Sequence, residues 1–88
     1  MKKLLLGKYS IKGGFFIEFS VTPHTDKEDL VTNLTRSLKM ANVQSLKSLE
    51  DIEYYILGSF DDITGELEPI SKEYLFRVLD FIPKEASA

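Results

Sequence analysis

Three carboxylates, Asp61, Asp62 and Glu66, follow a run of strand-forming residues and flank the pair Thr64-Gly65. Calcium and magnesium favour carboxylate oxygens, so this segment is a candidate cation site. The spacing of a calcium-binding loop, with acids at positions 1, 3, 5 and 12, is absent. Asp instead accepts backbone hydrogen bonds in turns, and Gly takes the left-handed position there. We therefore predict a turn between two strands, and no metal site.

The sequence contains few residues arranged as a catalytic site would need. The single histidine, His24, lies between Pro23 and Thr25 just before a predicted helix, where we interpret it as a loop residue. A general base needs a nucleophile or an acid as its partner, and neither a Ser/His/Asp order, an HExxH motif nor a Cys/His pair occurs. The segment "KGG" lacks the lysine and hydroxyl positions of a phosphate-binding loop. We predict a protein that is not an enzyme and has no cofactor.

Nucleic-acid binding is the chemistry that the N-terminal residues favour. Proteins that bind single strands combine a cationic groove with aromatic side chains on which bases stack. Lysines and aromatic residues alternate near the start of the chain, and Phe16 is predicted to lie on the outward side of a strand. The alternative is that Phe16 packs inside the monomer or in a dimer contact. The candidate binding residues are Lys2, Lys3, Lys8, Tyr9, Lys12, Phe16, Arg36 and Lys39.

The charge is distributed unevenly along the chain. The net charge is −3, which argues against a generally basic nucleic-acid binder. Residues 1–44 carry seven Lys and Arg against four acids, net +3, and residues 45–88 carry four against ten, net −6. Such asymmetry can give one molecule a basic face and an acidic face. Scattered surface charge is the alternative.

These residues need a scaffold, and the first part of it is a β-hairpin predicted over residues 3–21. Gly13 and Gly14 can adopt the positive φ of a tight hairpin turn, and Gly7 marks a bulge or a close approach. Apolar residues alternate along the second strand, as in a half-buried strand. The residues predicted to face the core are Phe15, Ile17, Phe19 and Val21, and those predicted to face outward are Phe16, Glu18 and Ser20.

An amphipathic helix is predicted over residues 26–41. Thr25 and Glu28 form a capping-box signature at its start. Its apolar residues recur at helical spacing on one face, namely Val31, Leu34, Leu38 and Ala41. Residues 43–51 fit either a second helix or a loop.

The second half of the chain is predicted to form a strand over residues 52–60, a turn, and a short returning strand that Pro69 restricts to a sheet edge. "SKEYLFRVLDFIP" then predicts a helix that begins at Ser71 and stops at Pro83, with a strand over "YLFRVLDFI" as the competing interpretation. The whole is an α+β fold of a single domain, residues 1–88. We expect an antiparallel sheet of three to four strands in ββαββα order, with helices on one face.

Composition bounds the cellular setting. The absence of cysteine excludes disulfides and fits a reducing cytoplasm. "MKKLLLGKYS" contains an apolar run too short for a signal peptide, and no segment approaches the roughly 20 residues of a membrane span. We expect a soluble, cytoplasmic protein with no membrane partner, in which oligomerisation adds to the marginal stability of a small domain.

The segment "LEDIEYYILGSFDDITGELEP", residues 49–69, carries a family resemblance. An acid-aromatic pair, a hydrophobic strand, Gly58, Phe60-Asp61-Asp62, Thr64-Gly65 and Pro69 follow in order. This arrangement resembles the small non-structural proteins of gokushovirus-type microviruses, which are tailless icosahedral phages with single-stranded DNA. The aromatic-rich strand pair and the helix upstream agree in layout.

The resemblance implies a non-virion protein of the host bacterial cytoplasm that acts in DNA replication, in the switch to single-strand synthesis, or in packaging. Its implied partners are single-stranded DNA and viral or host replication and packaging proteins, and a homo-oligomer is expected. No catalytic residue transfers from this family. The alternative function is a module that binds a host or viral protein without touching DNA.

Overall fold

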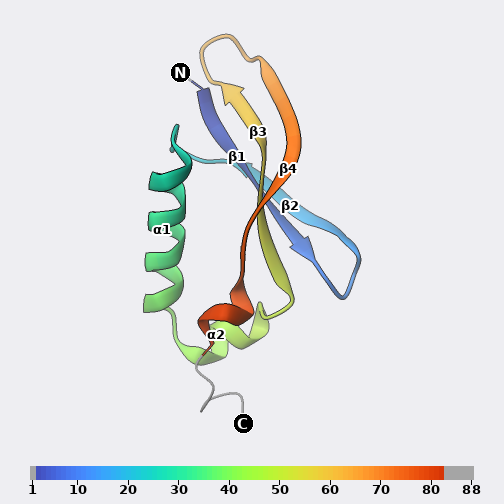
Figure 1. Cartoon of the computed structure of the whole chain (residues 1–88), viewed down its shortest axis with the longest axis vertical. Helices are drawn as coiled ribbons and strands as arrows, with labels where there is room; N and C mark the ends of the chain where they lie inside the picture. Colours follow the sequence, from blue (N-terminus) through green and yellow to red (C-terminus); the bar gives the residue numbers. More distant parts are fainter. Residues whose placement is uncertain (1, 83–88) are drawn as a thin grey trace.

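The computed structural model describes residues 2–82, which form a four-stranded antiparallel sheet, two α-helices and a final 3-10 turn. The strands are β1 (Lys2–Ser10), β2 (Phe15–Val21), β3 (Ile52–Asp61) and β4 (Leu67–Arg77), and their spatial order is β2-β1-β3-β4. The helices α1 (Lys27–Met40) and α2 (Val43–Ser48) lie between β2 and β3 in sequence, and η1 (Val78–Phe81) follows β4. Figure 1 shows α1 beside the sheet, with α2 and η1 near one end of it.

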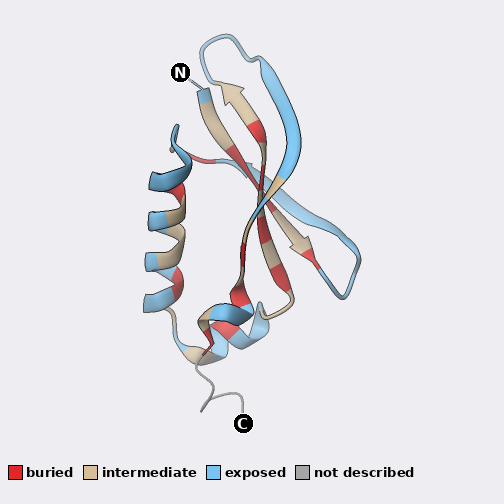
Figure 2. Ribbon diagram, viewed as in Figure 1, coloured by how far each residue is buried: buried red, intermediate tan, exposed pale blue. Residues whose placement is uncertain are grey.

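The predicted hairpin is confirmed, with Gly14 at φ 75° in its turn. The predicted core side of its second strand is wrong, because Phe15, Ile17, Phe19 and Val21 are all exposed, like the rest of β2 (Figure 2). Phe16 is exposed, as predicted. A bulge explains the changed register: Lys8 pairs with Glu18 but Tyr9 pairs with Phe16, so Ile17 is an extra residue on β2. The bulge exchanges the two sides of the strand: Phe16, before it, lies on the same side of the sheet as Phe19 and Val21, after it.

The helix predicted over residues 26–41 is confirmed as α1. Its N-cap is Asp26, whose carboxylate accepts a hydrogen bond from the backbone N–H of Asp29 at 3.3 Å. Residues 43–51, for which the sequence fits either a helix or a loop, begin with the helix α2. The side chain of Asn42 caps its first turn by accepting a hydrogen bond from the N–H of Ser45 at 2.8 Å.

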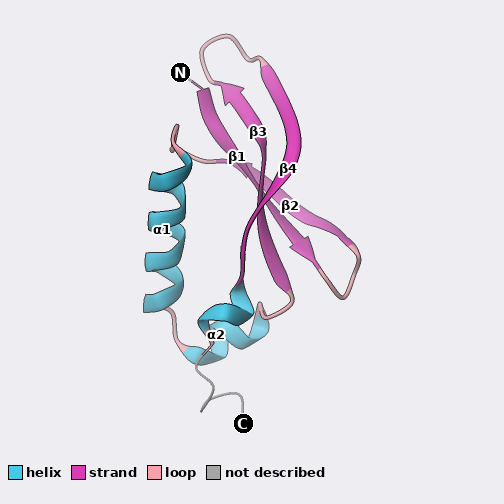
Figure 3. Ribbon diagram, in the orientation of Figure 1, coloured by secondary structure: helices cyan, strands magenta, loops and turns pink. Residues whose placement is uncertain are grey.

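The C-terminal helix predicted from Ser71 is wrong. The strand β4 instead continues to Arg77, and within the described residues it is followed by η1 (Figure 3). Residues Tyr74, Phe76 and Arg77 each pair with a residue of β3, and these non-local contacts decide between two patterns that the local sequence both supports. The element order is therefore β1-β2-α1-α2-β3-β4 and not ββαββα. Pro83 lies outside the described residues.

One face of the sheet packs against the helices, as predicted. Its core is formed by alternate residues of β1, β3 and β4 together with residues of α1, α2 and the C-terminal turn. The buried residues of this cluster are Leu6, Leu30, Leu38, Leu46, Ile52, Tyr54, Ile56, Phe76, Val78 and Ile82. Because Leu6 faces this core, Leu4, Lys8 and Ser10 share its side of β1, and Leu5, Gly7 and Tyr9 lie on the opposite side.

Gly58 allows β3 and β4 to approach each other. Its φ is 153°, and a Cβ atom there would lie 2.2 Å from the backbone oxygen of Glu68 and 2.9 Å from the Cα of Pro69. The register of the two strands shifts at this point, between Ile56 and Gly58. Pro69 belongs to β4, an edge strand of the sheet, as its missing N–H predicted.

Replacement of Gly58 by alanine tests this close approach. We expect Gly58→Ala to lower the free energy of unfolding by about 2–6 kcal/mol, which combines backbone strain with overpacking. The matched control is Gly65→Ala: Gly65 also has a positive φ, 79°, but a Cβ there meets nothing within 4 Å. It should cost only the left-handed conformation, about 1–2 kcal/mol. Equal losses in urea unfolding would contradict the close approach.

Candidate functional site

A row of aromatic rings, one from each strand, crosses the face of the sheet opposite the helices, here called the open face. The rings are Phe16 on β2, Tyr9 on β1, Tyr55 on β3 and Tyr74 on β4, here called the aromatic row. Tyr9 pairs with Phe16 across β1 and β2, and Tyr55 pairs with Tyr74 across β3 and β4. The row therefore crosses the whole width of the sheet.

The rings contact one another edge to face. Ring centroids lie 5.1 Å apart for Tyr9 and Phe16, 6.2 Å for Tyr9 and Tyr55, and 5.6 Å for Tyr55 and Tyr74. These distances and the steep interplanar angles fall in the range that favours aromatic pairs. Each ring thus holds its neighbour's orientation, while Phe16 and Tyr74 stay 37% and 49% exposed.

Gly7 explains how rings from non-adjacent strands can touch. Phe16 and Tyr55 belong to strands separated by β1, yet their centroids are 5.5 Å apart. A Cβ at Gly7 would lie 2.6 Å from Cδ1 of Leu57 and 3.1 Å from Cε2 of Phe16. The missing side chain therefore leaves space that Leu57 and Phe16 occupy over β1. The close approach that the sequence allowed at this glycine is confirmed.

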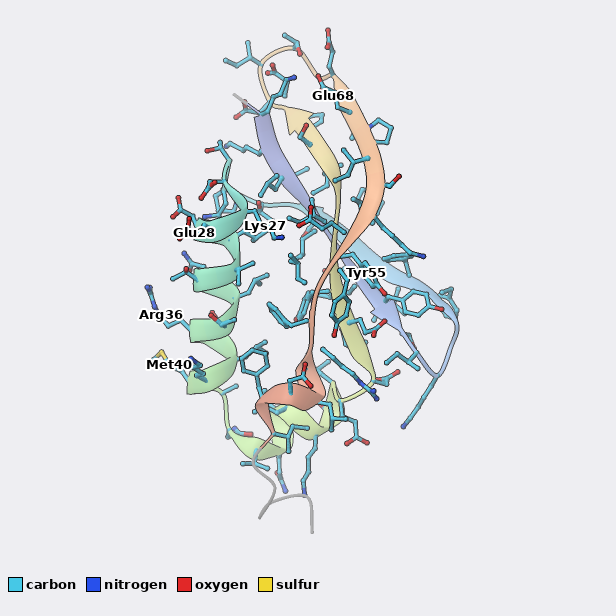
Figure 4. The ribbon with its side chains drawn as sticks, in the orientation of Figure 1. Lys27, Glu28, Arg36, Met40, Tyr55 and Glu68 are labelled. Atoms are coloured by element: carbon cyan, nitrogen blue, oxygen red, sulfur yellow. The ribbon has the colours of Figure 1, made fainter. Side chains whose placement is uncertain are left out.

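The environment of the row raises the pKa of two of its tyrosines, Tyr55 and Tyr74. The hydroxyl of Tyr55, labelled in Figure 4, donates to Oε1 of Glu53 at 3.0 Å. Burial, and then this hydrogen bond, raise the pKa of Tyr55. Burial, followed by the charges of Asp80 and Glu53, raises the pKa of Tyr74. At neutral pH both rings remain uncharged, so they do not repel an anion.

Positive charge reaches the row from β4. The Nζ of Lys72 lies 5.8 Å from the ring centroid of Tyr55, within the range of a cation–π contact. Arg77 of β4 lies opposite Glu53 of β3 in the strand register, on the same face of the sheet. Its Nε donates a hydrogen bond to the backbone oxygen of Glu50 at 3.2 Å. Neither cation was among the residues predicted from the sequence.

Only two of the eight predicted binding residues, Tyr9 and Phe16, come together. Lys8 lies on the core side of β1, opposite to them, and its Nζ is 3.7 Å from Glu18. Arg36 and Lys39 are exposed on α1, and Figure 4 shows Arg36 directed away from the sheet. Lys12 is exposed in the hairpin turn.

The remaining predicted cations, Lys2 and Lys3, make ion pairs with carboxylates from the other end of the chain. Lys2 contacts Glu68 at 2.5 Å, and Lys3 contacts Asp62 at 3.0 Å. Lys27, at the start of α1, likewise pairs with Glu73 on β4. The basic first half is thus matched to the acidic second half across the sheet, which explains the uneven charge distribution without a continuous basic face.

The sequence indicated Tyr55 as a residue of the open face more clearly than it indicated Tyr74 and Lys72. Tyr55 follows Tyr54 in a strand that was predicted correctly, so alternation alone places it opposite the core side chains. Tyr74 and Lys72 could be found only through the competing strand interpretation of the C-terminal segment.

The carboxylate segment forms the turn predicted from its spacing. Oδ1 of Asp61 accepts from the N–H groups of Ile63 at 2.9 Å and Thr64 at 3.2 Å, and the N–H of Gly65 donates to the Asp61 carbonyl at 2.8 Å. These backbone bonds to Ile63 and Thr64 lower the pKa of Asp61. The hydrogen bond from Lys3 lowers the pKa of Asp62. Within residues 2–82, no three His, Cys, Asp or Glu side chains form a group that could hold a metal ion.

Comparisons with known proteins add no relative. No protein-family model matches the chain, and neither the curated proteins nor the solved structures contain a match. In the described part of the chain, neither helix has the length and apolar character needed to cross a lipid bilayer.

The turn gives a pH-dependent prediction. Because the pKa of Asp61 is lower in the folded protein than its ordinary value of 3.8, the ionised carboxylate stabilises the fold above that value. This contribution is lost as the pH falls through the lowered pKa. Asp61→Asn keeps an oxygen acceptor for the turn but cannot titrate. We expect the stability difference between the wild type and Asp61→Asn to shrink between about pH 5 and pH 2, as measured by urea unfolding. A difference that is constant with pH would contradict this role.

Proposed function

We propose that this chain binds single-stranded DNA across the open face of its sheet, as a phage non-structural protein acting in genome replication or packaging. The observation that carries the proposal is the aromatic row, with one ring from each of four adjacent strands. Bases stack on such rings with little dependence on sequence, each contributing about 1–3 kcal/mol. The resemblance of residues 49–69 to microvirus proteins supplies the biological setting.

The distribution of charge shapes how such binding would work. Lys72 and Arg77 flank the row, whereas Lys2, Lys3 and Lys8 are paired with carboxylates. Stacking would therefore provide most of the affinity, and phosphate contacts would be few. Two or three neutralised phosphates correspond to a slope of log affinity against log salt of roughly −1.4 to −2.1 for a single strand.

A second candidate function is an adaptor that binds a host or viral protein without contacting DNA. The exposed apolar side chains of β2 favour it, because large exposed apolar patches mark interaction sites. The two candidates differ in whether purified protein binds an oligonucleotide at all.

Titration of a fluorescently labelled single-stranded oligonucleotide tests the proposed interface. Tyr74→Ala should weaken binding roughly 5- to 150-fold, which corresponds to the ~1–3 kcal/mol of one stacked base. Lys72→Glu should also weaken it. The matched control is Lys39→Glu, which makes the same charge change on α1 and should leave the affinity unchanged.

Two results would overturn the interface. One is wild-type protein that binds no oligonucleotide at about 50 mM salt, which would favour the adaptor function. The other is Lys39→Glu weakening binding as much as Lys72→Glu, which would show that the phosphates lie along α1.

A further inference from the structure

The outer edge of β2 is an unprotected strand edge. Its sequence FFIEFSV has no proline, no lysine and one charged residue, Glu18, which pairs with Lys8 of the same chain. Phe15 and Phe19 are 59% and 66% exposed, and Ile17 and Val21 are close to half exposed. Proteins usually protect such edges with proline, charge or a covering element, because an open edge can pair with another strand.

The opposite edge of the sheet has the protection that β2 lacks. β4 contains Pro69, which cannot donate to another strand, and four charged side chains. One of them, Glu73, is also tied to Lys27 of α1. The contrast indicates that strand pairing is disfavoured at β4 and open at β2.

The backbone of β2 is oriented for pairing. The N–H of Thr22 donates to the Leu4 carbonyl at 2.9 Å, so the backbone groups of Thr22 point toward β1. Alternation along the regular part of the strand then directs the N–H and C=O groups of Phe19 and Val21 away from β1, toward the free edge.

We propose that a second copy of this chain pairs with that edge, β2 against β2, in an antiparallel arrangement with its two-fold axis beside Phe19. In this register Phe19 lies opposite Phe19 of the other copy, Ile17 opposite Val21, and Glu18 opposite Ser20. A register centred on Glu18 would place two carboxylates directly opposite, which is destabilising. A register centred on Ile17 would fall on the bulge.

The available area makes this a weak but specific dimer. A phenylalanine side chain offers about 150–250 Å², so the exposed parts of Phe15 and Phe19 sum to on the order of 250 Å² per copy. With Ile17, Val21 and the strand backbone, two copies approach the roughly 1,000 Å² at the lower limit of specific interfaces. The pairing uses the same edge in both copies, so it closes at two subunits and leaves no free β2 edge.

The two-fold symmetry of the dimer would enlarge the surface that binds DNA, a consequence that rests on the proposed function. A two-fold axis perpendicular to the sheet keeps both open faces on the same side. The sheet then has eight strands. Because Phe16 is three residues from the axis at Phe19, the Phe16 rings of the two copies lie roughly 20 Å apart along the strands, and the two Phe19 rings lie between them on the same face. A dimer would therefore cover a longer single strand than one copy.

Sedimentation equilibrium of the purified chain without DNA tests the dimer separately from nucleic-acid binding. The mass should rise from 10.0 kDa toward twice that value between about 1 µM and 1 mM. Phe19→Lys should raise the dimer dissociation constant at least about tenfold, and Val21→Lys provides a second variant if Phe19→Lys does not fold. The matched control Ile63→Lys introduces the same charge at an apolar residue that is 83% exposed in the β3–β4 turn, and it should dimerise like the wild type.

A mass of one subunit at every concentration would overturn the dimer and leave the edge to a strand of another protein. Dimerisation of both lysine variants of β2 with wild-type affinity would also overturn it. A monomeric wild type that still binds DNA would refute the dimer and leave the proposed function standing.

Single cysteines test the register, because the natural chain has none. Residues at the two-fold of an antiparallel pair have Cα atoms about 5.5 Å apart when they are hydrogen-bonded, within reach of a disulfide. Phe19→Cys, oxidised with copper phenanthroline, should give a covalent dimer rapidly, and Glu18→Cys should not. The reverse order would overturn the proposed register.

Discussion

The structure depends on the packing of one face of the sheet against α1, α2 and the C-terminal turn. Alternate side chains of β1, β3 and β4 enter this contact, and the buried cluster contains nearly all the buried apolar residues in the described part of the chain. Two helices cover only one face of a four-stranded sheet. The other face is therefore built differently: its rings pack against one another and keep part of their surface in water. Gly7 makes this possible, because its missing side chain lets Phe16 reach Tyr55 over β1.

Local patterns in the sequence were enough to predict the hairpin, α1 and the turn at Asp61, because each depends on contacts between residues close in the chain. The facing of β2 could not be predicted, since one extra residue at Ile17 exchanges the sides of the strand and leaves no mark in the alternation. The C-terminal segment fits two periods, with Leu75, Val78, Leu79 and Ile82 at helical spacing and Tyr74 and Phe76 as partners of β3. Only the presence of β3 decides between them.

The candidate site was predicted in part for the same reason. Tyr9 and Phe16 belong to the correctly predicted hairpin and do lie together on the open face. The lysines around them were grouped by sequence proximity, but neighbouring residues of a strand point to opposite faces, and Lys2 and Lys3 find carboxylates more than fifty residues away. Ion pairs at exposed positions each contribute little to stability. The cations beside the aromatic row are Lys72 and Arg77 of β4, not the N-terminal lysines.

The central claim is that the open face of the sheet is the surface that meets a single strand. It is tested most directly by two-dimensional NMR of the isotopically labelled protein, titrated with an unlabelled oligonucleotide. The claim predicts that backbone and ring signals of Tyr9, Phe16, Tyr55 and Tyr74 shift together, while those of Arg36 and Lys39 on α1 do not. Shifts confined to α1, or none at saturating oligonucleotide, would contradict it.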